Sequence, residues 1–164
     1  MHVGFIGPSG CGKTTLAQHV CASHRRAGWG TLACDPLGAK WDAHRQTDNA
    51  EKFLGWAQAS RNCKLFIDEA GLTIDRDRAF QWLFVTARHH GHQTHVMMHD
   101  ASQLLPVMRK QLSKIFLFRC HRDDAETWAR QFCHPEIAEA VTLGRHEFLV
   151  IEAFAPVRRC KLKL

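Results

Sequence analysis

The stretch that decides the fold is Gly7-Pro8-Ser9-Gly10-Cys11-Gly12-Lys13-Thr14, which Thr15 follows. It matches the pattern GxxxxGK[ST] and stands between an apolar run over 2–6 and an amphipathic run over 13–27, the strand and helix that this motif requires. Its glycines allow consecutive backbone N–H groups to turn toward one anion, and the positive end of the following helix points at the same place. We therefore predict that these nine residues cradle the phosphates of a nucleotide.

Two side chains of this loop have predicted roles of their own. Lys13 is placed to reach the β- and γ-phosphates, and the Thr14 hydroxyl is placed to ligate Mg²⁺. The alternative is a glycine-rich turn with a chance lysine, and the flanking strand and helix argue against it. Lys13 is therefore a predicted catalytic residue, and Thr14 a predicted metal ligand.

A second element with chemical potential is the apolar strand over 64–67, which ends in Asp68-Glu69. The carboxyl ends of parallel strands line the ligand crevice of an α/β sheet. Asp68 is then placed to hold the Mg²⁺ shell, and Glu69 is placed to orient or deprotonate a water for attack on the γ-phosphate. The alternative is a solvated strand end. The pairing of the two acids favours hydrolysis of a nucleoside triphosphate over transfer to a small acceptor.

The rest of the chain alternates strand-like and helix-like segments. Strands are predicted over 31–34, 94–99 and 114–119, helices over 49–60, 75–90, 102–111 and 122–132, and a loop over 37–48. The segments 147–154 and 157–162 are typical of a hairpin around Ala155-Pro156. This order predicts a single α/β domain over 1–164, with a mostly parallel central sheet, helices on both faces and a C-terminal β-hairpin.

Composition sets limits on the class of protein. The 164 residues are 45% hydrophobic and 23% charged, which fits a globular chain, and no apolar run reaches the length of a membrane span. The chain reads from its start into a strand, so we expect no signal peptide and a cytoplasmic location. The net charge of +6 suits a polyanionic partner. Seven cysteines without a CxxC pair are expected to be small buried hydrophobic residues; zinc at the two Cys-His dipeptides, 120–121 and 133–134, is a weaker alternative.

The stretch 87–119 carries a resemblance to a known family. It reads Ala-Arg-His-His-Gly over 87–91, then a strand with a polar tip at His99, then Leu-Pro-Val-Met-Arg over 105–109 and an apolar strand ending in Phe-Arg at 118–119. In this order and spacing it resembles the HerA/FtsK superfamily of DNA-pumping ATPases, and most of all its small viral genome-packaging ATPases. With the two nucleotide motifs the resemblance covers 2–120. It implies a P-loop NTPase fold of the RecA/ASCE-like type.

The resemblance also implies a function. It implies a Mg²⁺-dependent ATPase that moves double-stranded DNA independently of its sequence and packages a viral genome in the host cytoplasm, with association with the virion as an alternative location. Its implied partners are ATP, DNA, a capsid or portal protein, and further copies of the chain in a homo-oligomeric ring, often a hexamer. ATP sites between subunits need an arginine from the neighbour, for which Arg109 is the first candidate and Arg88 the second. His99 stands where the family usually carries a glutamine that senses the γ-phosphate, which puts that step in question.

Other interpretations stay open at the level of sequence. An assembly or secretion ATPase of filamentous phage, of the Zot type, shares the outline, although such proteins usually carry a membrane span. A small nucleotide or nucleoside kinase fits the length and the loop, although we find no arginine-rich lid. The histidines at 89, 90, 92, 95 and 99 form either a basic rim or, less expectedly, a metal cluster. The five tryptophans, at 29, 41, 56, 82 and 128, are expected to anchor the core or an interface; contact of Trp41, which lies in a polar segment, with nucleic acid is the weaker alternative.

Overall fold

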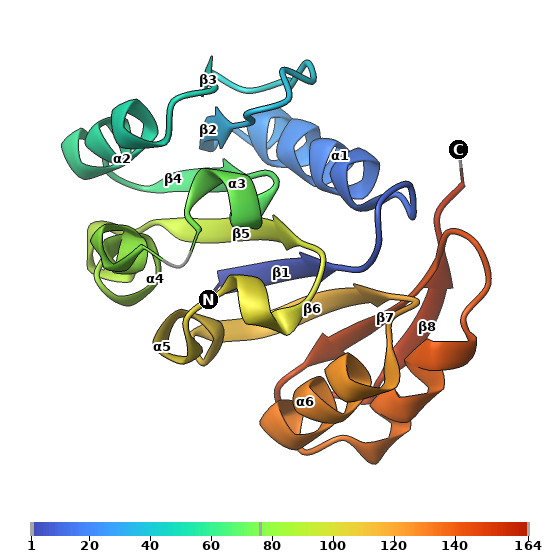
Figure 1. Ribbon diagram of the computed structural model, residues 1–164. Coiled ribbons are helices and arrows are strands. Elements are labelled where there is room, and N and C mark those ends of the chain that lie inside the picture. The colour runs from blue at the N-terminus through green and yellow to red at the C-terminus, as the bar shows by residue number, and fades with distance from the viewer. Residues whose placement is uncertain (1, 76, 164) are drawn as a thin grey trace.

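Eight strands form one sheet within the residues that the computed structural model describes, 2–75 and 77–163 (Figure 1). Their order is β3-β2-β4-β5-β1-β6-β7-β8. The first six in this order are parallel, and β7 and β8 are antiparallel. The bounds are β1 His2–Ile6, β2 Gly30–Cys34, β3 Arg45–Thr47, β4 Cys63–Ile67, β5 Gln93–Met98, β6 Leu112–Phe118, β7 Glu147–Glu152 and β8 Arg158–Lys161.

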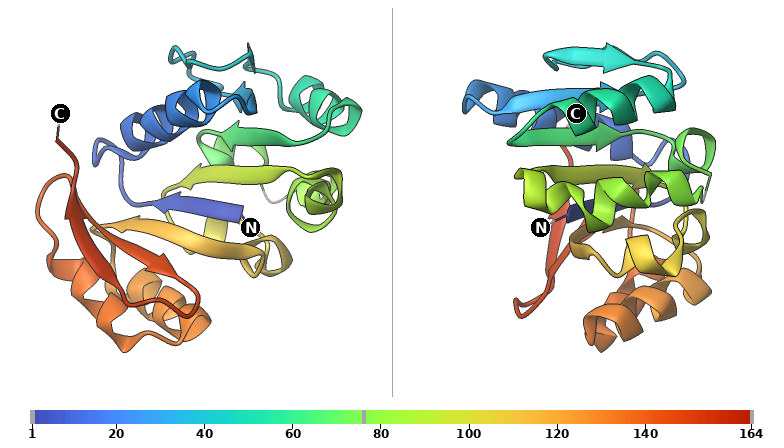
Figure 2. Two further views of the ribbon diagram at one scale, coloured as in Figure 1. Left: turned by 180° about the vertical axis from the view of Figure 1, so that it is seen from behind. Right: turned by 90° about the vertical axis from the view of Figure 1, so that its left-hand side faces the viewer.

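Helices cover both faces of this sheet (Figure 2). One face carries α1 (Lys13–Arg26), whose Ala17 and Cys21 pack with β-strand residues in a cluster of their own. The other face carries α2 (Ala50–Ala59), α4 (Trp82–Val85), α5 (Pro106–Arg109), α6 (Arg122–Phe132) and the 3₁₀ segment η4 (Pro135–Thr142). The predicted α/β architecture with a mostly parallel sheet and a C-terminal antiparallel hairpin is therefore confirmed.

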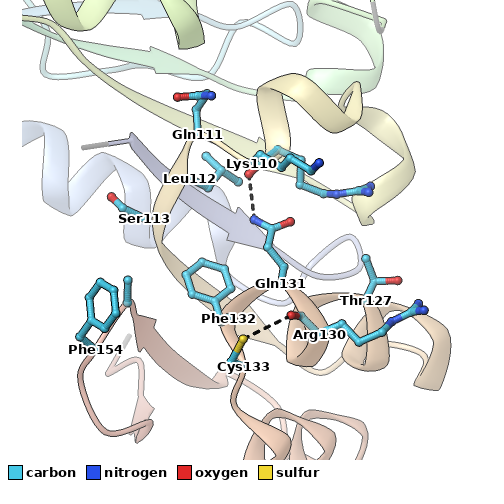
Figure 3. A pocket seen from close by; sticks show the side chains of 12 residues that line it. Lys110, Gln111, Leu112, Ser113, Thr127, Arg130, Gln131, Phe132, Cys133 and Phe154 are labelled. Atoms are coloured by element: carbon cyan, nitrogen blue, oxygen red, sulfur yellow. Dashed lines mark hydrogen bonds between the residues drawn. The ribbon is translucent and has the colours of Figure 1, made fainter.

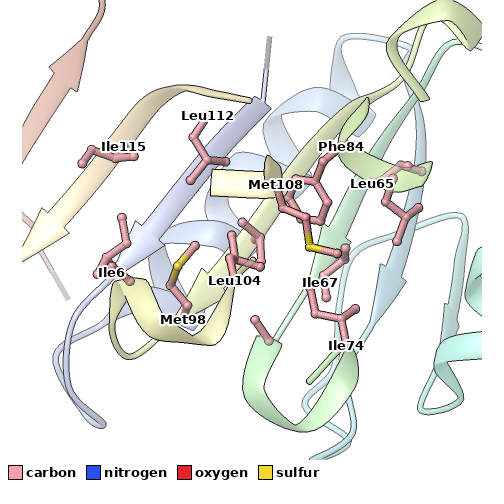
Figure 4. Packing of buried hydrophobic residues seen from close by; sticks show 14 of the residues in the cluster. Ile6, Leu65, Ile67, Ile74, Phe84, Met98, Leu104, Met108, Leu112 and Ile115 are labelled. Atoms are coloured by element: carbon pink, nitrogen blue, oxygen red, sulfur yellow. The ribbon is translucent and has the colours of Figure 1, made fainter. Parts of the chain in front are cut away.

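Alternation along the strands sends apolar side chains to both faces. In β1, Phe5 packs on the α1 side and Ile6 on the other, and both are fully buried. Figure 4 shows the cluster on the other face, which joins Ile6, Met98 and Ile115 of three neighbouring strands with Leu104 and Met108. Burying a side chain of this size contributes about 1.5–3 kcal/mol. The parallel strands thus form a rigid platform, and the loops at its carboxyl edge start from fixed points.

The long helix predicted over 75–90 is wrong. The chain instead forms η1 (Arg78–Gln81), α4 and η2 (Ala87–His90), and Arg76 lies outside the described residues. Val85 and Thr86 are β-branched, which lowers helix propensity, and the helix ends at Thr86, where φ is −98°. The short pieces still bury Phe80 and Leu83, so the apolar spacing was informative about the core but not about the continuity of the helix.

The helix predicted over 102–111 is also divided. A 3₁₀ turn, η3 (Ala101–Gln103), is followed by extended backbone at Leu104 and Leu105, and α5 begins at Pro106. A proline disfavours the helical conformation of the residue before it, and ψ is 145° at Leu105. Three further elements lie where no strand or helix was predicted: β3 inside the expected loop over 37–48, α3 (Ala70–Thr73) after β4, and η4 after α6.

The hairpin predicted over 147–162 is present, with β7 and β8 shorter than expected by two residues or fewer at each end. β7 pairs with β6, so the hairpin extends the sheet beyond the parallel strands. Among the described residues, no helix combines the length and the apolar character that a membrane crossing needs.

Candidate nucleotide-binding site

The loop between β1 and α1 has a backbone that only glycine adopts readily at three positions. Gly7, Gly10 and Gly12 have φ values of 151°, 73° and 109°. A Cβ on Gly7 would lie 2.7 Å from the Cβ of Phe118, and a Cβ on Gly12 would lie 2.9 Å from Leu162. At Gly7 the backbone conformation and the lack of space both disfavour a side chain, whereas at Gly12 the neighbour is the flexible end of Leu162 and the backbone conformation is the main constraint. The glycines are consistent with the predicted phosphate cradle.

Lys13 is the first residue of α1, and its side chain folds back into this loop. Its side chain is almost fully buried, and Nζ donates to the carbonyl oxygens of Gly7 at 2.8 Å and Pro8 at 3.0 Å. A buried ammonium needs partners of this kind, because an unpaired charge away from water is costly. The contacts hold the positive charge within the loop, where it can exchange carbonyl oxygens for phosphate oxygens.

The two sequence motifs meet in space through Thr14 and Asp68. The Thr14 hydroxyl donates to Oδ2 of Asp68 at 2.9 Å, although 54 positions separate the two residues. The meeting follows from the sheet order, because β4 and β1 flank β5 and all three end at the same edge. Hydroxyl and carboxylate oxygens are the ligands that Mg²⁺ accepts, with substrate phosphates supplying others. These two residues fit the predicted metal position.

Burial raises the pKa of the Asp68 carboxyl above its ordinary value, and the hydrogen bonds from the Thr14 hydroxyl and the Glu69 amide oppose this rise. The neighbouring carboxylate of Asp35, buried at the end of β2, raises the pKa further. The carboxyl edge of the sheet therefore concentrates negative charge around Asp68. A dication beside Thr14 and Asp68 would relieve this repulsion, which is a second reason that the residues fit Mg²⁺.

Glu69 has a left-handed backbone, with φ 46° and ψ 65°, which is uncommon for a residue other than glycine. Several hydrogen bonds hold it there: its amide donates to Oδ1 of Asp68 at 2.9 Å, and its carbonyl accepts from the amides of Leu72 and Thr73, the last two residues of α3 (Ala70–Thr73). Strained backbone of this kind persists where the surroundings over-determine it, often at functional sites. It fixes the direction in which the Glu69 side chain leaves the strand.

The Glu69 side chain meets His99, which follows β5. Nε2 of His99 lies 2.7 Å from Oε2 of Glu69, and the backbone amide of His99 donates to Gln103 at 2.7 Å. Both side chains are partly exposed, so solvent reaches the pair. The structure thus brings the predicted base and the predicted γ-phosphate sensor into direct contact. In this arrangement the imidazole orients the carboxylate.

Arg109 does not belong to the same group of residues. It ends α5, three residues before Leu112, which pairs with His2 at the start of β1 (Figure 1). The phosphate loop follows the other end of β1, about 13 Å further along that strand. Arg109 donates to the Ala101 carbonyl at 2.8 Å. The second candidate, Arg88 in η2, also precedes a strand and so lies at the amino edge of the sheet.

Arg109 lines a cleft of about 980 Å³ at this amino edge. Figure 3 shows Lys110 and Arg130 on one side of the cleft and Phe154 on the other, with Gln131 between them. Gln131 donates to the Arg109 carbonyl at 2.9 Å, which ties α6 to the end of α5. The cleft is basic and faces away from the phosphate loop.

The clustered histidines have separate environments. His92 accepts a hydrogen bond from the Cys63 amide and is buried, and His95 is buried and stacked on Phe66 with 4.3 Å between the ring centroids. No group of three or more His, Cys, Asp or Glu side chains among residues 2–75 and 77–163 is arranged to hold a metal ion. Trp41 is buried, as expected of a core tryptophan, and its Nε1 donates to Asp35 at 2.9 Å; the alternative that it contacts nucleic acid is therefore wrong.

Two residues of the site were missed from the sequence. Asp35 accepts backbone hydrogen bonds from Leu37, Gly38 and Ala39 in addition to the bond from Trp41, and so shapes the loop after β2. The Asp-Pro-x-Gly pattern of an aspartate-initiated turn is a signal that identifies it. His146 contacts the phosphate loop at Cys11, and no local pattern points to it.

A second cleft, of about 420 Å³, adjoins the phosphate loop. The loop residues 8–11 form one wall, and the end of β6 with the turn before β7 forms the other. Arg119 and Arg145 contribute positive charge to this wall. The cleft offers room for the nucleoside part of a nucleotide whose phosphates occupy the loop.

The fold and this group of residues define a P-loop NTPase: a glycine-rich cradle, a lysine inside it and an acidic strand end at its mouth. The ATPase family associated with various cellular activities (AAA) matches residues 3–129, and the chain belongs to this family. No curated protein matches the chain by sequence.

Solved structures with the same fold include several viral and secretion ATPases. The genome packaging NTPase B204 from Sulfolobus turreted icosahedral virus 2, in complex with ATP-gammaS, is 17% identical, with a TM-score of 0.80 over 99% of this chain and 98% of that one. VirB4 of Thermoanaerobacter pseudethanolicus is 10% identical, with a TM-score of 0.72 over 99% and 89%. The N-terminal domain of zonular occludens toxin from Neisseria meningitidis is 16% identical, with a TM-score of 0.63 over 99% and 94%. The predicted similarity to small viral packaging ATPases is thus confirmed at the level of the fold.

Proposed function

We propose that this chain is the motor of a viral genome-packaging machine, a Mg²⁺-dependent ATPase that moves double-stranded DNA into a capsid. The observation that carries the proposal is the match to the packaging NTPase over nearly the whole of both chains, together with a complete set of nucleotide-site residues. VirB4 and the zonular occludens toxin share the fold with lower TM-scores, so the fold by itself does not choose the cargo.

In this proposal the residues at the carboxyl edge divide the chemistry of hydrolysis. The phosphates lie in the loop over 7–15, Lys13 binds the β- and γ-phosphates, and Thr14 and Asp68 hold Mg²⁺. The metal, when bound, neutralises charge that develops on the phosphates. Glu69 accepts a proton from the attacking water, and His99 keeps the carboxylate directed toward that water.

The proposed DNA contact is electrostatic. A net charge of +6 suits binding to phosphates, which supply affinity without reading sequence. A packaging motor must also dock on a capsid or portal protein, and it would work in the host cytoplasm. Binding should weaken steeply as salt rises, because each neutralised phosphate releases counterions.

A ring of identical subunits would give Arg109 a role in hydrolysis. At the amino edge, its guanidinium cannot serve the nucleotide of its own chain, but it can serve the nucleotide of a neighbour. We propose that the cleft beside Arg109 faces the adjacent subunit and that Arg109 stabilises charge on the neighbour's phosphates. Arg88, on the same edge, is the alternative donor.

Mixing two inactive variants tests this arrangement directly. Glu69→Gln keeps the arginine and lacks the base, whereas Arg109→Ala keeps the base and lacks the arginine. If each site combines residues of two subunits, mixed rings regain sites in which both residues are intact, and hydrolysis reappears. In the matched control, Glu69→Gln is mixed with Arg88→Ala in place of Arg109→Ala. No recovery with Arg109→Ala and recovery with Arg88→Ala would move the role to Arg88.

The first experiment on the function as a whole measures ATP hydrolysis with and without long duplex DNA, while light scattering follows assembly in the same samples. The proposal predicts stimulation by DNA together with formation of a ring. Lys13→Ala is the control for hydrolysis by a contaminant. Turnover by a monomer that DNA does not change would refute the motor function, and phosphate transfer to a nucleoside would then support the kinase alternative.

A further inference from the structure

His146 connects the C-terminal hairpin to the phosphate loop. It lies in the turn before β7 with a left-handed φ of 63°, and its Nδ1 is 3.1 Å from the carbonyl oxygen of Cys11, 135 positions away. Its own carbonyl accepts from the amide of Leu162, which follows β8, at 2.9 Å. The backbone of His146 is therefore bonded to the hairpin, and its side chain is bonded to the phosphate loop.

The same hairpin packs against the loop through apolar contacts. The side chain of Leu162 lies so close to Gly12 that a Cβ there would be 2.9 Å from Cδ2. Phe148 of β7 is buried with Phe118 of β6, and Cys11 and Leu162 pack against this cluster. The phosphate loop thus packs against an apolar cluster, and the His146 hydrogen bond adds a directional interaction to that packing.

The chemistry of this hydrogen bond fixes a peptide plane. A carbonyl oxygen can only accept a hydrogen bond. Nδ1 of His146 therefore carries a proton, and this N–H donates a hydrogen bond to the carbonyl oxygen of Cys11. In a trans peptide the C=O of one residue and the N–H of the next point in opposite directions. Holding the Cys11 carbonyl toward His146 therefore aims the Gly12 N–H away from it, as a loop that presents N–H groups to phosphate requires.

We propose that His146 is a positioning residue for nucleotide binding: by fixing the Cys11–Gly12 peptide from the C-terminal hairpin, it keeps the phosphate cradle in its binding shape. This inference rests on the nucleotide site proposed above and is independent of DNA. It assigns the hairpin, which lies beyond the AAA match over 3–129, a part in the affinity for ATP.

The test compares His146→Ala with His146→Asn in the full chain. Alanine removes the donor, whereas the amide of asparagine can replace Nδ1 and asparagine tolerates the left-handed backbone. Titration with Mg·ATP without DNA should give a dissociation constant about fivefold higher for His146→Ala, the factor that one ordinary hydrogen bond contributes. His146→Asn should stay near wild type. His19→Ala, which removes an exposed histidine from α1, is the matched control and should not change binding.

A second readout separates positioning from general damage. At saturating ATP, His146→Ala should keep kcat within about twofold of wild type while KM rises, because the groups at Asp68, Glu69 and His99 are intact. If His146→Ala does not fold, His146→Gly takes its place, since glycine also lacks the donor and accommodates the left-handed φ.

Three outcomes would overturn the inference. The first is a dissociation constant for Mg·ATP that is unchanged in His146→Ala. The second is an equal loss of affinity in His146→Asn, which would show that the hydrogen-bond donor is irrelevant. The third is a wild-type chain that does not bind ATP, in which case the nucleotide site and the inference fail together. Weakening in His146→Ala with recovery in His146→Asn supports it.

Discussion

Replacement of Gly7 by alanine should disable the phosphate loop, and the structure gives the size of the effect. Gly7 has φ 151°, and its added Cβ would lie 2.7 Å from the Cβ of Phe118 and 3.2 Å from Sγ of Cys11. The first neighbour is the stem of a fully buried side chain and cannot move aside as a flexible end could. The backbone of the loop must therefore shift.

Two costs add in this substitution. A backbone conformation reserved for glycine costs about 1–3 kcal/mol, and forced overpacking costs about 1–3 kcal/mol more. Gly10 offers a matched control, because its φ is 73° and nothing lies within 4 Å of an added Cβ. Gly10→Ala should cost only the backbone part, about 1–2 kcal/mol. Gly7→Ala should accordingly exceed Gly10→Ala by at least about 1 kcal/mol.

The assays are urea denaturation, which gives the free energy of unfolding, and titration with Mg·ATP. The Gly7 carbonyl accepts from Lys13 at 2.8 Å and the Gly7 amide donates to Met98 at 3.2 Å, so a shift there also displaces the ammonium and the loop. We expect Gly7→Ala to lose most of its nucleotide binding. If it proved as stable as Gly10→Ala and bound ATP equally well, the packing of Phe118 against the loop would not constrain the cradle, and the reasoning would be wrong.

Three further predictions concern the base, its partner and acid stability. Glu69→Gln should lower hydrolysis at least about 100-fold while ATP still binds, as single-turnover and binding assays would show; near-normal turnover would exclude Glu69 as the base. His99→Gln should keep more activity than His99→Ala, because an amide can still donate to Glu69 at the distance that the imidazole uses, and equal rates in steady-state assays would contradict this. Burial lowers the pKa of His2 to about 4 and that of His95 to about 3, below the ordinary value of an exposed imidazole. The unfolded chain therefore binds these protons first, so stability is full above about pH 6.5 and falls by up to about 1.4 kcal/mol per pH unit for each histidine as the pH drops below it. Urea denaturation from pH 7 to pH 5 measures this slope, and a flat profile would argue against neutral buried imidazoles.

The candidate site illustrates what a local pattern can predict. The loop over 7–15 could be found because its backbone conformation, its lysine and its helix are all encoded within a few residues. Asp68 and Glu69 could be found because an apolar strand carries its last residues to a predictable edge of the sheet. The contact of Thr14 with Asp68 was implied once both motifs were placed in one parallel sheet.

Local patterns were weaker where packing competes with propensity. The apolar spacing over 75–90 is helical, but the chain follows the core in short turns, and Pro106 breaks the next predicted helix at Leu105. β3 has three residues and no apolar alternation, so only its pairing with β2 makes it a strand. Trp41 lies in a polar segment, but Asp35 gives its indole a buried partner.

The sequence by itself determined the class of chemistry, because a phosphate cradle and an acidic strand end are local structures that short stretches encode. The tertiary structure decided how those parts are connected. The order of the strands brings His99 to Glu69 and carries Arg109 to the opposite edge, and the C-terminal hairpin brings His146 to Cys11. These contacts join residues up to 135 positions apart. Such a contact forms only when the sheet brings two distant segments together. It therefore depends on the tertiary structure, and no short stretch of sequence predicts it.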